Sequence, residues 1–129
     1  MSGAHTSKVN ALLWNDASET VFSGGDDGAL HAWHWSSKKK KLKRLYSAKG
    51  HSGIVTALAP IEGPLLVACY ETGDVVVWSV SKDGAVEVAI GQVRCPAYSC
   101  CVRASLSECV IMVGTLAKVY FMVFERGVR

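Results

Sequence analysis

Short stretches of alternating apolar and polar residues follow one another along the chain, with turn-forming residues between them. The first four stretches span residues 9–14, 20–24, 30–35 and 42–48. Alternation with a period of two predicts half-buried strands, because successive side chains of a strand point to opposite faces. Asp27-Gly28, between the second and third stretches, is a strong hairpin signal, since Gly adopts a positive φ without steric cost. Residues 9–48 therefore predict four short antiparallel strands.

The same pattern begins again after residue 50. Its four stretches span residues 54–58, 64–70, 75–78 and 86–93. Three landmarks recur at nearly one interval: 46 positions separate His5 from His51, 45 separate Gly28 from Gly73, and 45 separate Trp33 from Trp78. Because the three spacings agree to within one residue, we infer that the chain contains an internal repeat.

A third and weaker copy follows Cys95-Pro96. Its expected strands are residues 98–106, 109–114 and 118–124, and Val119 lies 44 positions after Val75. This copy has lost the His, the Asp-Gly turn and the Trp, and Met122 stands where the Trp would fall. No stretch has the apolar period and the caps of a helix. The pattern predicts an all-β chain.

A period of about 45 residues, four strands per repeat, a Gly-His dipeptide at the start and a Trp that ends a strand are typical of propeller blades. The chain resembles the WD-repeat β-propeller family over nearly its whole length, without pointing to a particular member. The resemblance implies antiparallel four-stranded blades in a partial, about three-bladed WD-repeat β-propeller. A single region, residues 1–129, would hold blade 1 (4–49), blade 2 (50–94) and a degenerate blade 3 (95–125).

The resemblance also implies a structural tetrad in the first repeat. In the family, a His bonds to an Asp and to a Ser, and the Ser bonds to the indole N–H of a Trp. The matching residues in this chain are His5, Ser23, Asp27 and Trp33. Such a network has a physical basis, because a buried indole N–H or carboxylate without a partner is costly. We expect these residues to hold blade 1 together, although His34 stands where an Asp commonly follows the Trp.

The second repeat retains only part of this pattern. It has His51 and Trp78, but Ala68 and Thr72 occupy the Ser and Asp positions. We therefore expect a partial second tetrad of His51 and Trp78. The third repeat has no tetrad residue and is expected to rely on apolar packing of Val110, Ile111, Val113, Val119 and Phe121.

Composition and charge indicate a globular protein with one basic segment. Half of the residues are hydrophobic and 19% are charged, which argues against disorder. The formal net charge is +3, and subtracting the six positive charges within residues 38–44 leaves the rest of the chain at −3. These six residues are Lys38, Lys39, Lys40, Lys41, Lys43 and Arg44. We expect them to form a solvated loop between the third and fourth strands of blade 1.

Three roles fit the basic segment. It could keep a sheet edge soluble, act as a nuclear import signal, or bind an acidic partner, nucleic acid or an anionic lipid surface. Aromatic residues near it are few, so base-specific recognition of a nucleic acid is not expected.

No residue pattern indicates catalysis or a metal site. His31 and His34 lie three residues apart on a predicted strand, so their side chains point to opposite faces and do not suit one zinc ion. Asp26 and Asp27 are better explained as hairpin residues than as paired catalytic carboxylates. The chain also lacks a phosphate-binding glycine loop and a nucleophile motif. The sequence predicts a protein that is not an enzyme and needs no cofactor or metal.

Cysteine usage and hydropathy predict a soluble protein in a reducing compartment. The cysteines are odd in number and form no Cys-x-x-Cys pair, so we interpret them as small apolar core groups. They are Cys69, Cys95, Cys100, Cys101 and Cys109. The first residues form no apolar signal segment, and the apolar residues 110–124 are too few for a membrane span of about 20 residues. We expect a cytoplasmic protein, with the nucleus as the alternative.

The resemblance implies a non-catalytic scaffold that mediates protein–protein interactions in a larger assembly. The expected surfaces are the loops at residues 15–19, 25–28, 71–74 and 116–118, with the segments near His5 and His51. The alternative function is a basic-loop module that binds nucleic acid or an anionic membrane.

Three blades are too few for a closed ring, because propellers have typically 4 to 8 blades. Two open sheet faces would remain. Three hypotheses account for them: a fragment or short isoform of a longer propeller protein, completion by blades of another chain, or association with a second copy. A fourth replaces the third blade by an irregular β-sandwich.

Overall fold

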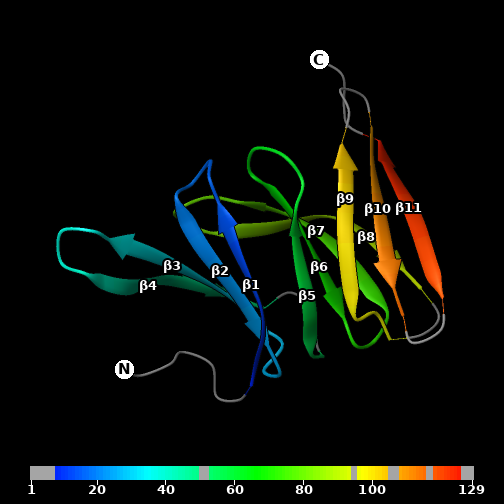
Figure 1. Cartoon of the computed structure of the whole chain (residues 1–129), viewed down its shortest axis with the longest axis horizontal. Coiled ribbons are helices and arrows are strands. Elements are labelled where there is room, and N and C mark those ends of the chain that lie inside the picture. The colour runs from blue at the N-terminus through cyan, green and yellow to red at the C-terminus, as the bar shows by residue number, and fades with distance from the viewer. Residues whose placement is uncertain (1–7, 50–52, 94–95, 105–107, 116–117, 126–129) are drawn as a thin grey trace.

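The computed structural model describes residues 8–49, 53–93, 96–104, 108–115 and 118–125. Within this part, eleven strands form three antiparallel sheets in chain order (Figure 1). Sheet 1 consists of β1 (Val9–Asn15), β2 (Thr20–Gly25), β3 (Leu30–Ser36) and β4 (Lys41–Ala48). Sheet 2 consists of β5 (Val55–Pro60), β6 (Leu65–Tyr70), β7 (Asp74–Val80) and β8 (Ala85–Gln92). Sheet 3 consists of β9 (Ser99–Ala104), β10 (Glu108–Gly114) and β11 (Val119–Glu125).

The fold is all-β, as the alternating pattern predicts, and each sheet pairs its strands strictly in sequence order. Sheets 1 and 2 share two irregularities of register. One lies between Val9 and Ala11 in β1, and its counterpart lies between Val55 and Ala57 in β5. The other directly precedes Trp33 in β3 and Trp78 in β7. The internal repeat thus extends from the landmark residues to the strand pairing itself.

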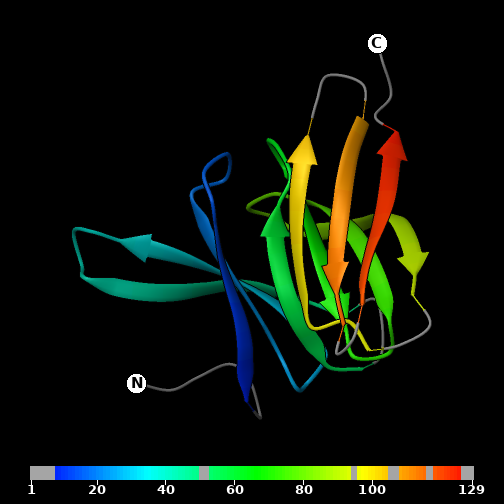
Figure 2. The same ribbon diagram turned by 45° about the vertical axis from the view of Figure 1, so that its right-hand side comes forward.

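The two central strands of sheet 2, β6 and β7, are buried on both faces. On one face, Leu66, Ala68 and Tyr70 belong to a core that also contains Phe22 and Leu30 of sheet 1. The intervening residues of β6 belong to a second core, shared with sheet 3. Burial on both faces explains why β6 is apolar at every position, since neither set of alternate side chains meets water. Figure 2 shows the three sheets following one another with sheet 2 in the middle.

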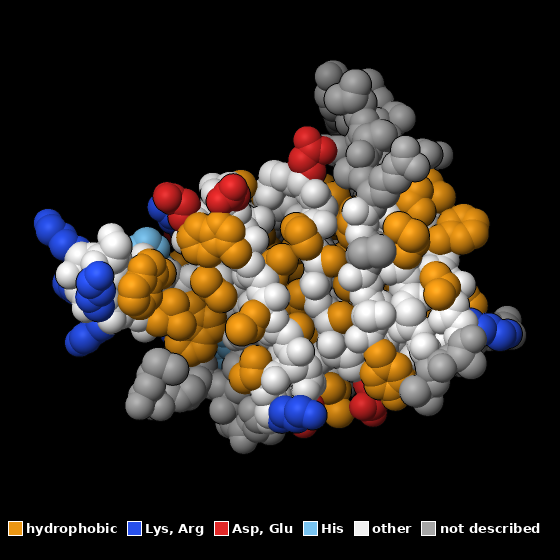
Figure 3. Space-filling model, in the orientation of Figure 1, with side chains coloured by type: hydrophobic (Ala, Val, Ile, Leu, Met, Phe, Trp, Pro, Cys, Tyr) orange, Lys and Arg blue, Asp and Glu red, His pale blue; other side chains and the backbone are white. Residues whose placement is uncertain are grey.

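The outer faces of sheets 1 and 3 carry exposed apolar side chains. On β11, Tyr120 and Met122 pack against the core. Val119 and Phe121 are 77% and 72% exposed, so the expectation that these two pack the third repeat was wrong, because the alternation of β11 turns them to the outer face. Hydrophobic side chains gather on this side of the molecule and near the β3–β4 hairpin (Figure 3). On sheet 1, Leu12 is exposed as well. The two outer sheets are therefore each half-covered, as a partial propeller requires.

The basic segment is only partly the loop that the sequence predicts. The turn between β3 and β4 covers residues 37–40, and Lys40 has a φ of 53°. Lys41, Lys43 and Arg44 lie in β4 instead, where the expected strand began at residue 42. Lysine is tolerated there because β4 is the edge strand of sheet 1 and these side chains reach water.

Among the described residues, no helix has the length and the apolar character needed to cross a membrane.

Candidate functional site

One hydrogen bond of the predicted first-repeat tetrad is present in the structure. Trp33 on β3 donates its indole N–H to the Ser23 hydroxyl on β2 over 2.9 Å. Ser23 is buried and Trp33 is half-buried, so this bond satisfies a donor that water reaches poorly. His5 lies outside the described residues. The tetrad as a whole therefore stays a prediction, with its Ser–Trp bond in place.

Asp27 organises the turn between β2 and β3. Its Oδ1 accepts a hydrogen bond from the Ala29 backbone N–H at 3.1 Å, and its Oδ2 lies 3.3 Å from Nε2 of His31. The hydroxyl of Ser47 on β4 lies 2.6 Å from the other ring nitrogen, Nδ1. A neutral imidazole with its proton on Nε2 satisfies both contacts, because it donates to Asp27 and accepts from Ser47.

His31 and Ser47 are network members that sequence analysis missed. His31 is buried and stands directly opposite Ser23 across the β2–β3 pair, and its ring centroid lies 6.5 Å from that of Trp33. The sequence did contain a signal for His31, since it precedes Trp33 by two residues and so shares its face of the strand. Ser47 gave no such signal, because its position depends on the pairing of β3 with β4.

The second sheet has the same architecture without the same bonds. The indole N–H of Trp78 is buried and has no hydrogen-bond partner, and Ala68 occupies the place that Ser23 takes in sheet 1. Burial raises the pKa of the Tyr70 hydroxyl to about 12; the nearby Trp78 indole offsets part of that rise, although no hydrogen bond of normal geometry joins the two. Thr72 hydrogen-bonds to Asp74 inside its own turn. His51 lies outside the described residues.

We expect Ser23→Ala and Ala68→Ser to have opposite effects on stability. Ser23→Ala leaves the Trp33 indole unpaired and should cost about 1–2 kcal/mol, whereas Ala68→Ser gives Trp78 a partner and should gain up to about 1 kcal/mol. Urea unfolding followed by far-UV circular dichroism measures both. In a Trp78→Phe background the gain from Ala68→Ser should vanish, and a gain that persists there would contradict the assignment.

Turns of sheets 1 and 2 meet at one end of the molecule. We call this the proximal end, where β1, β5 and β9 begin. A Cβ placed on Gly28 would lie 2.6 Å from the carbonyl oxygen of Gly53, and one on Gly53 would lie 3.0 Å from the Thr72 methyl group. The Asn10 amide donates to both Asp26 and the Val55 carbonyl, each over 2.9 Å. The proximal turns of the two sheets therefore form one continuous, interlocked surface.

The loop at residues 15–19 does not belong to that surface. Strand β2 runs from Thr20 to Gly25, so this loop and the Asp27 turn lie at opposite ends of the sheet. Asn15 instead donates to the carbonyl of Gly63 over 3.1 Å, which joins the β1–β2 and β5–β6 turns at the distal end. The loop at residues 15–19, one of the expected binding loops, therefore lies at the opposite end of the sheet from the proximal turns.

The exposed side chains of the proximal end are chemically mixed. Lys8 and Asp26 lie beside the first turn, Glu71 belongs to the second, and Tyr98 and Lys118 lie near the third. Residues 116 and 117, which the sequence assigns to this surface, lie outside the described residues. The described part of the surface offers both charges and an exposed aromatic ring, which are common features of protein-binding sites.

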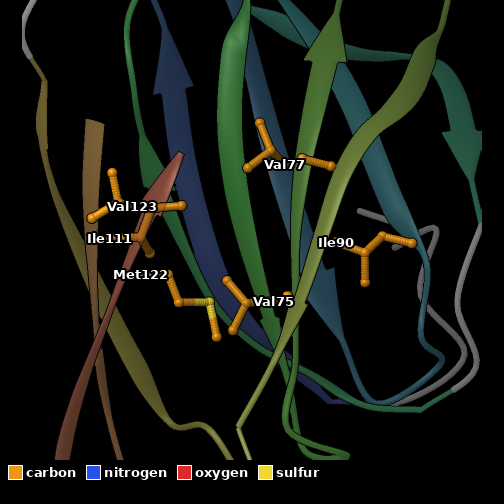
Figure 4. A pocket seen from close by; sticks show the side chains of 8 residues that line it. Val75, Val77, Ile90, Ile111, Met122 and Val123 are labelled. Carbon is orange, nitrogen blue, oxygen red and sulfur yellow. The ribbon is translucent and has the colours of Figure 1, made fainter. Parts of the chain in front are cut away.

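The cleft between sheets 2 and 3 is small and apolar. Its volume is about 90 Å³, and Val75, Ile111 and Met122 are among its lining residues (Figure 4). A Cβ on Gly91 would lie 2.6 Å from the Met122 sulfur, so this glycine lets the two sheets approach. Pockets for small molecules are usually several times larger and include polar groups. The cleft is best described as a gap in packing between sheets.

The described thiols behave as core groups. Cys69 on β6 and Cys100 on β9 lie in the core between sheets 2 and 3, and both are free. A hydrogen bond with Cys100 and burial both raise the pKa of the Cys69 thiol, which therefore stays protonated. Within the described part of the chain, no three His, Cys, Asp or Glu side chains come together in a way that could hold a metal ion.

Comparison with known proteins gives matches in sequence and in structure. Residues 2–34 match the model of the family "WD domain, G-beta repeat". Cilia- and flagella-associated protein 57 of Mus musculus is 28% identical over 53 residues, which are 41% of this chain and 4% of that protein. The SIR4-interacting protein SIF2 of Saccharomyces cerevisiae is 24% identical over 86 residues, which are 67% of this chain and 15% of that protein.

A solved structure matches the fold over nearly all of the chain. A chain of the crystal structure of the mitotic checkpoint complex aligns with a TM-score of 0.73 and 14% sequence identity. The alignment covers 95% of this chain and 38% of that one. In each comparison, this chain spans well under half of the protein that it matches.

Proposed function

The chain belongs to the WD-repeat family, and from this premise we propose that it is a non-catalytic scaffold that binds other proteins within a larger assembly. The proposed binding surface is the proximal end of the sheets. Two of the matched proteins support a role in protein binding. One is named as an interacting protein, and the other is part of a multi-protein complex. Those partners belong to the matched proteins, and the partner of this chain has to be found by experiment.

The observation that carries the proposal is the interlocking of the proximal turns. Gly28 of sheet 1 abuts the backbone of Gly53, and Asn10 bridges Asp26 and Val55. A surface whose turns are fixed before binding loses little conformational entropy when a partner docks. Function carried by loops on a rigid scaffold is common, and the mixed charges and exposed Tyr98 offer specific contacts.

Quantitative affinity capture with the full chain tests the proposal. Glu71→Lys and Tyr98→Ala change exposed proximal residues, whereas Glu62→Lys makes the same charge reversal at the distal end. We expect Glu71→Lys and Tyr98→Ala to reduce recovery of a partner several-fold, since a few central residues dominate most interfaces, and Glu62→Lys to retain it. Failure of the unmodified chain to retain any protein would overturn the proposed function.

A further inference from the structure

The β3–β4 hairpin projects beyond the core that anchors it. Leu45, Tyr46 and Ala48 pack against the core between sheets 1 and 2, and the Tyr46 hydroxyl donates to the Ser81 carbonyl over 2.8 Å. By contrast, residues 41–44 are all exposed. Figure 1 and Figure 2 both show the hairpin extending away from the three sheets. The second half of β4 is therefore held against the core, and the first half, residues 41–44, is exposed to solvent.

The first half of β4 also has a free strand edge. Strand β4 is last in the order of sheet 1 and pairs only with β3. Among the described residues, no strand lies against its other side, so its outward backbone N–H and C=O groups have no strand partner there. Such an edge can accept an extended peptide as an additional strand.

Side chains alternate along this edge in a way that selects a partner. Lys41 and Lys43 share one face, and Leu42 and Arg44 share the other. Leu42 stands opposite Trp35, and the two are 38% and 46% exposed. The edge therefore presents two ammonium groups on one face and a partly exposed apolar pair on the other. Lys and Arg side chains gather toward the far end of the hairpin (Figure 3).

The described part of the chain does not neutralise these charges. Among the described residues, none of the six basic side chains of residues 38–44 forms an ion pair. Nearby acidic groups are absent from the hairpin, because residues 30–48 contain no Asp or Glu. The uncompensated charge is thus available to an external acidic group.

We propose that the outer edge of β4 at residues 41–44 binds an extended acidic segment of a partner protein as an added strand. The segment carries carboxylates at every second position, beside Lys41 and Lys43, and an apolar residue between them beside Leu42. This inference rests on the proposed function. It adds a second protein-binding surface to the scaffold and states the chemistry of the partner that this surface binds.

Strand addition accounts for the edge and the charges together. A lipid surface or a nucleic acid would neutralise the lysines but would leave the backbone edge unpaired, since neither offers a polypeptide backbone. Lysines on an edge repel basic strands and disfavour neutral ones, because pairing with a neutral strand would desolvate the ammonium groups without compensation. A strand with acidic residues at the matching spacing compensates these charges. Charge therefore restricts an otherwise permissive edge to one class of partner.

Fluorescence anisotropy with the full chain and a labelled eight-residue peptide of alternating Glu and Val tests the proposal. One comparison peptide groups the same Glu residues at one end, and another has N-methyl groups along one backbone edge. We expect each comparison peptide to bind about tenfold more weakly, because it loses either the charge match or the backbone hydrogen bonds. Equal binding of the N-methylated peptide would overturn the proposal.

Two double variants distinguish the effect of lysines in β4 from the effect of the total positive charge of the hairpin. Lys41→Gln with Lys43→Gln should weaken binding of the alternating peptide about fivefold to tenfold, while Lys38→Gln with Lys39→Gln removes the same charge from the turn and should change it less than about twofold. Equal losses in the two double variants would overturn strand addition, because a diffuse charge effect would explain them. Thermal unfolding confirms that both variants fold.

Other ligands supply the remaining outcomes. If phosphatidylserine vesicles or polyuridylate bind in a Lys41- and Lys43-dependent manner and the alternating peptide does not, the proposal is wrong. If the peptide fails while affinity capture still recovers a partner that Glu71→Lys loses, this inference fails and the scaffold function stands. Peptide binding that requires Lys41 and Lys43 supports the inference whatever the proximal variants do.

Discussion

Gly28→Ala should destabilise the chain by about 3–4 kcal/mol, and Gly63→Ala should cost only about 1 kcal/mol. Both glycines have a positive φ, 76° at Gly28 and 58° at Gly63, so an added Cβ strains the backbone at either position. Their surroundings differ. A Cβ on Gly28 would lie 2.6 Å from the Gly53 carbonyl oxygen, whereas one on Gly63 would have no atom within 4 Å.

The difference between the two variants isolates the contact between sheets 1 and 2. The atom facing Gly28 belongs to backbone, which cannot rotate away as a flexible side chain does. To relieve the clash between the added Cβ and the Gly53 carbonyl oxygen, the Asp27 turn or the segment before β5 must move. The turn is held in place by the hydrogen bond from the Ala29 N–H to Asp27. Urea unfolding of the two variants side by side measures the difference. Equal costs would show that the proximal turns of sheets 1 and 2 are not interlocked.

The repeat and the strands were predictable because they depend on local pattern. Alternation of apolar and polar residues placed β1, β2 and β3 to within about two residues, since side-chain direction in a strand has a strict period. The weak third copy was recognised by the same rule and forms β9, β10 and β11. Local pattern sufficed where the deciding property was the alternation of side chains along a single strand.

The site was less predictable because its members meet across strands. Ser47 reaches His31 only through the register of β3 with β4, which shifts between Ala32 and Trp33. A shift of one residue would turn Ser47 to the opposite face. Likewise, the separation of the loop at 15–19 from the proximal turns follows from strand direction and not from composition. The sequence predicts a solvated loop for residues 38–44 because they fall between two expected strands, although an exposed edge strand tolerates the same composition.

Phe22→Ala should cost about 3–5 kcal/mol, because it opens a cavity in the core between sheets 1 and 2. Phe22 is fully buried, and its ring lies edge-on to that of Tyr46 with centroids 6.5 Å apart. A loss of this size is comparable with the whole stability of many small domains, so Phe22→Leu provides a second variant with an expected cost of about 1 kcal/mol. Urea unfolding monitored by circular dichroism measures both, and a cost below about 1 kcal/mol for Phe22→Ala would contradict the packing of sheet 1 on sheet 2.

Phe121→Ala is the matched control, with the same side chain removed from the outer face of sheet 3. Phe121 is 72% exposed, so its loss should change the free energy of unfolding by less than about 0.5 kcal/mol. The comparison also tests whether the outer face is covered in solution. If Phe121→Ala costs as much as Phe22→Ala and the cost rises with protein concentration, a second copy covers β11, since only association makes stability depend on concentration. If Phe121→Ala lowers the free energy of unfolding only slightly and at every protein concentration, a second copy does not cover this face. The face of Val119, Phe121 and Val123 is then accessible to a blade from another chain.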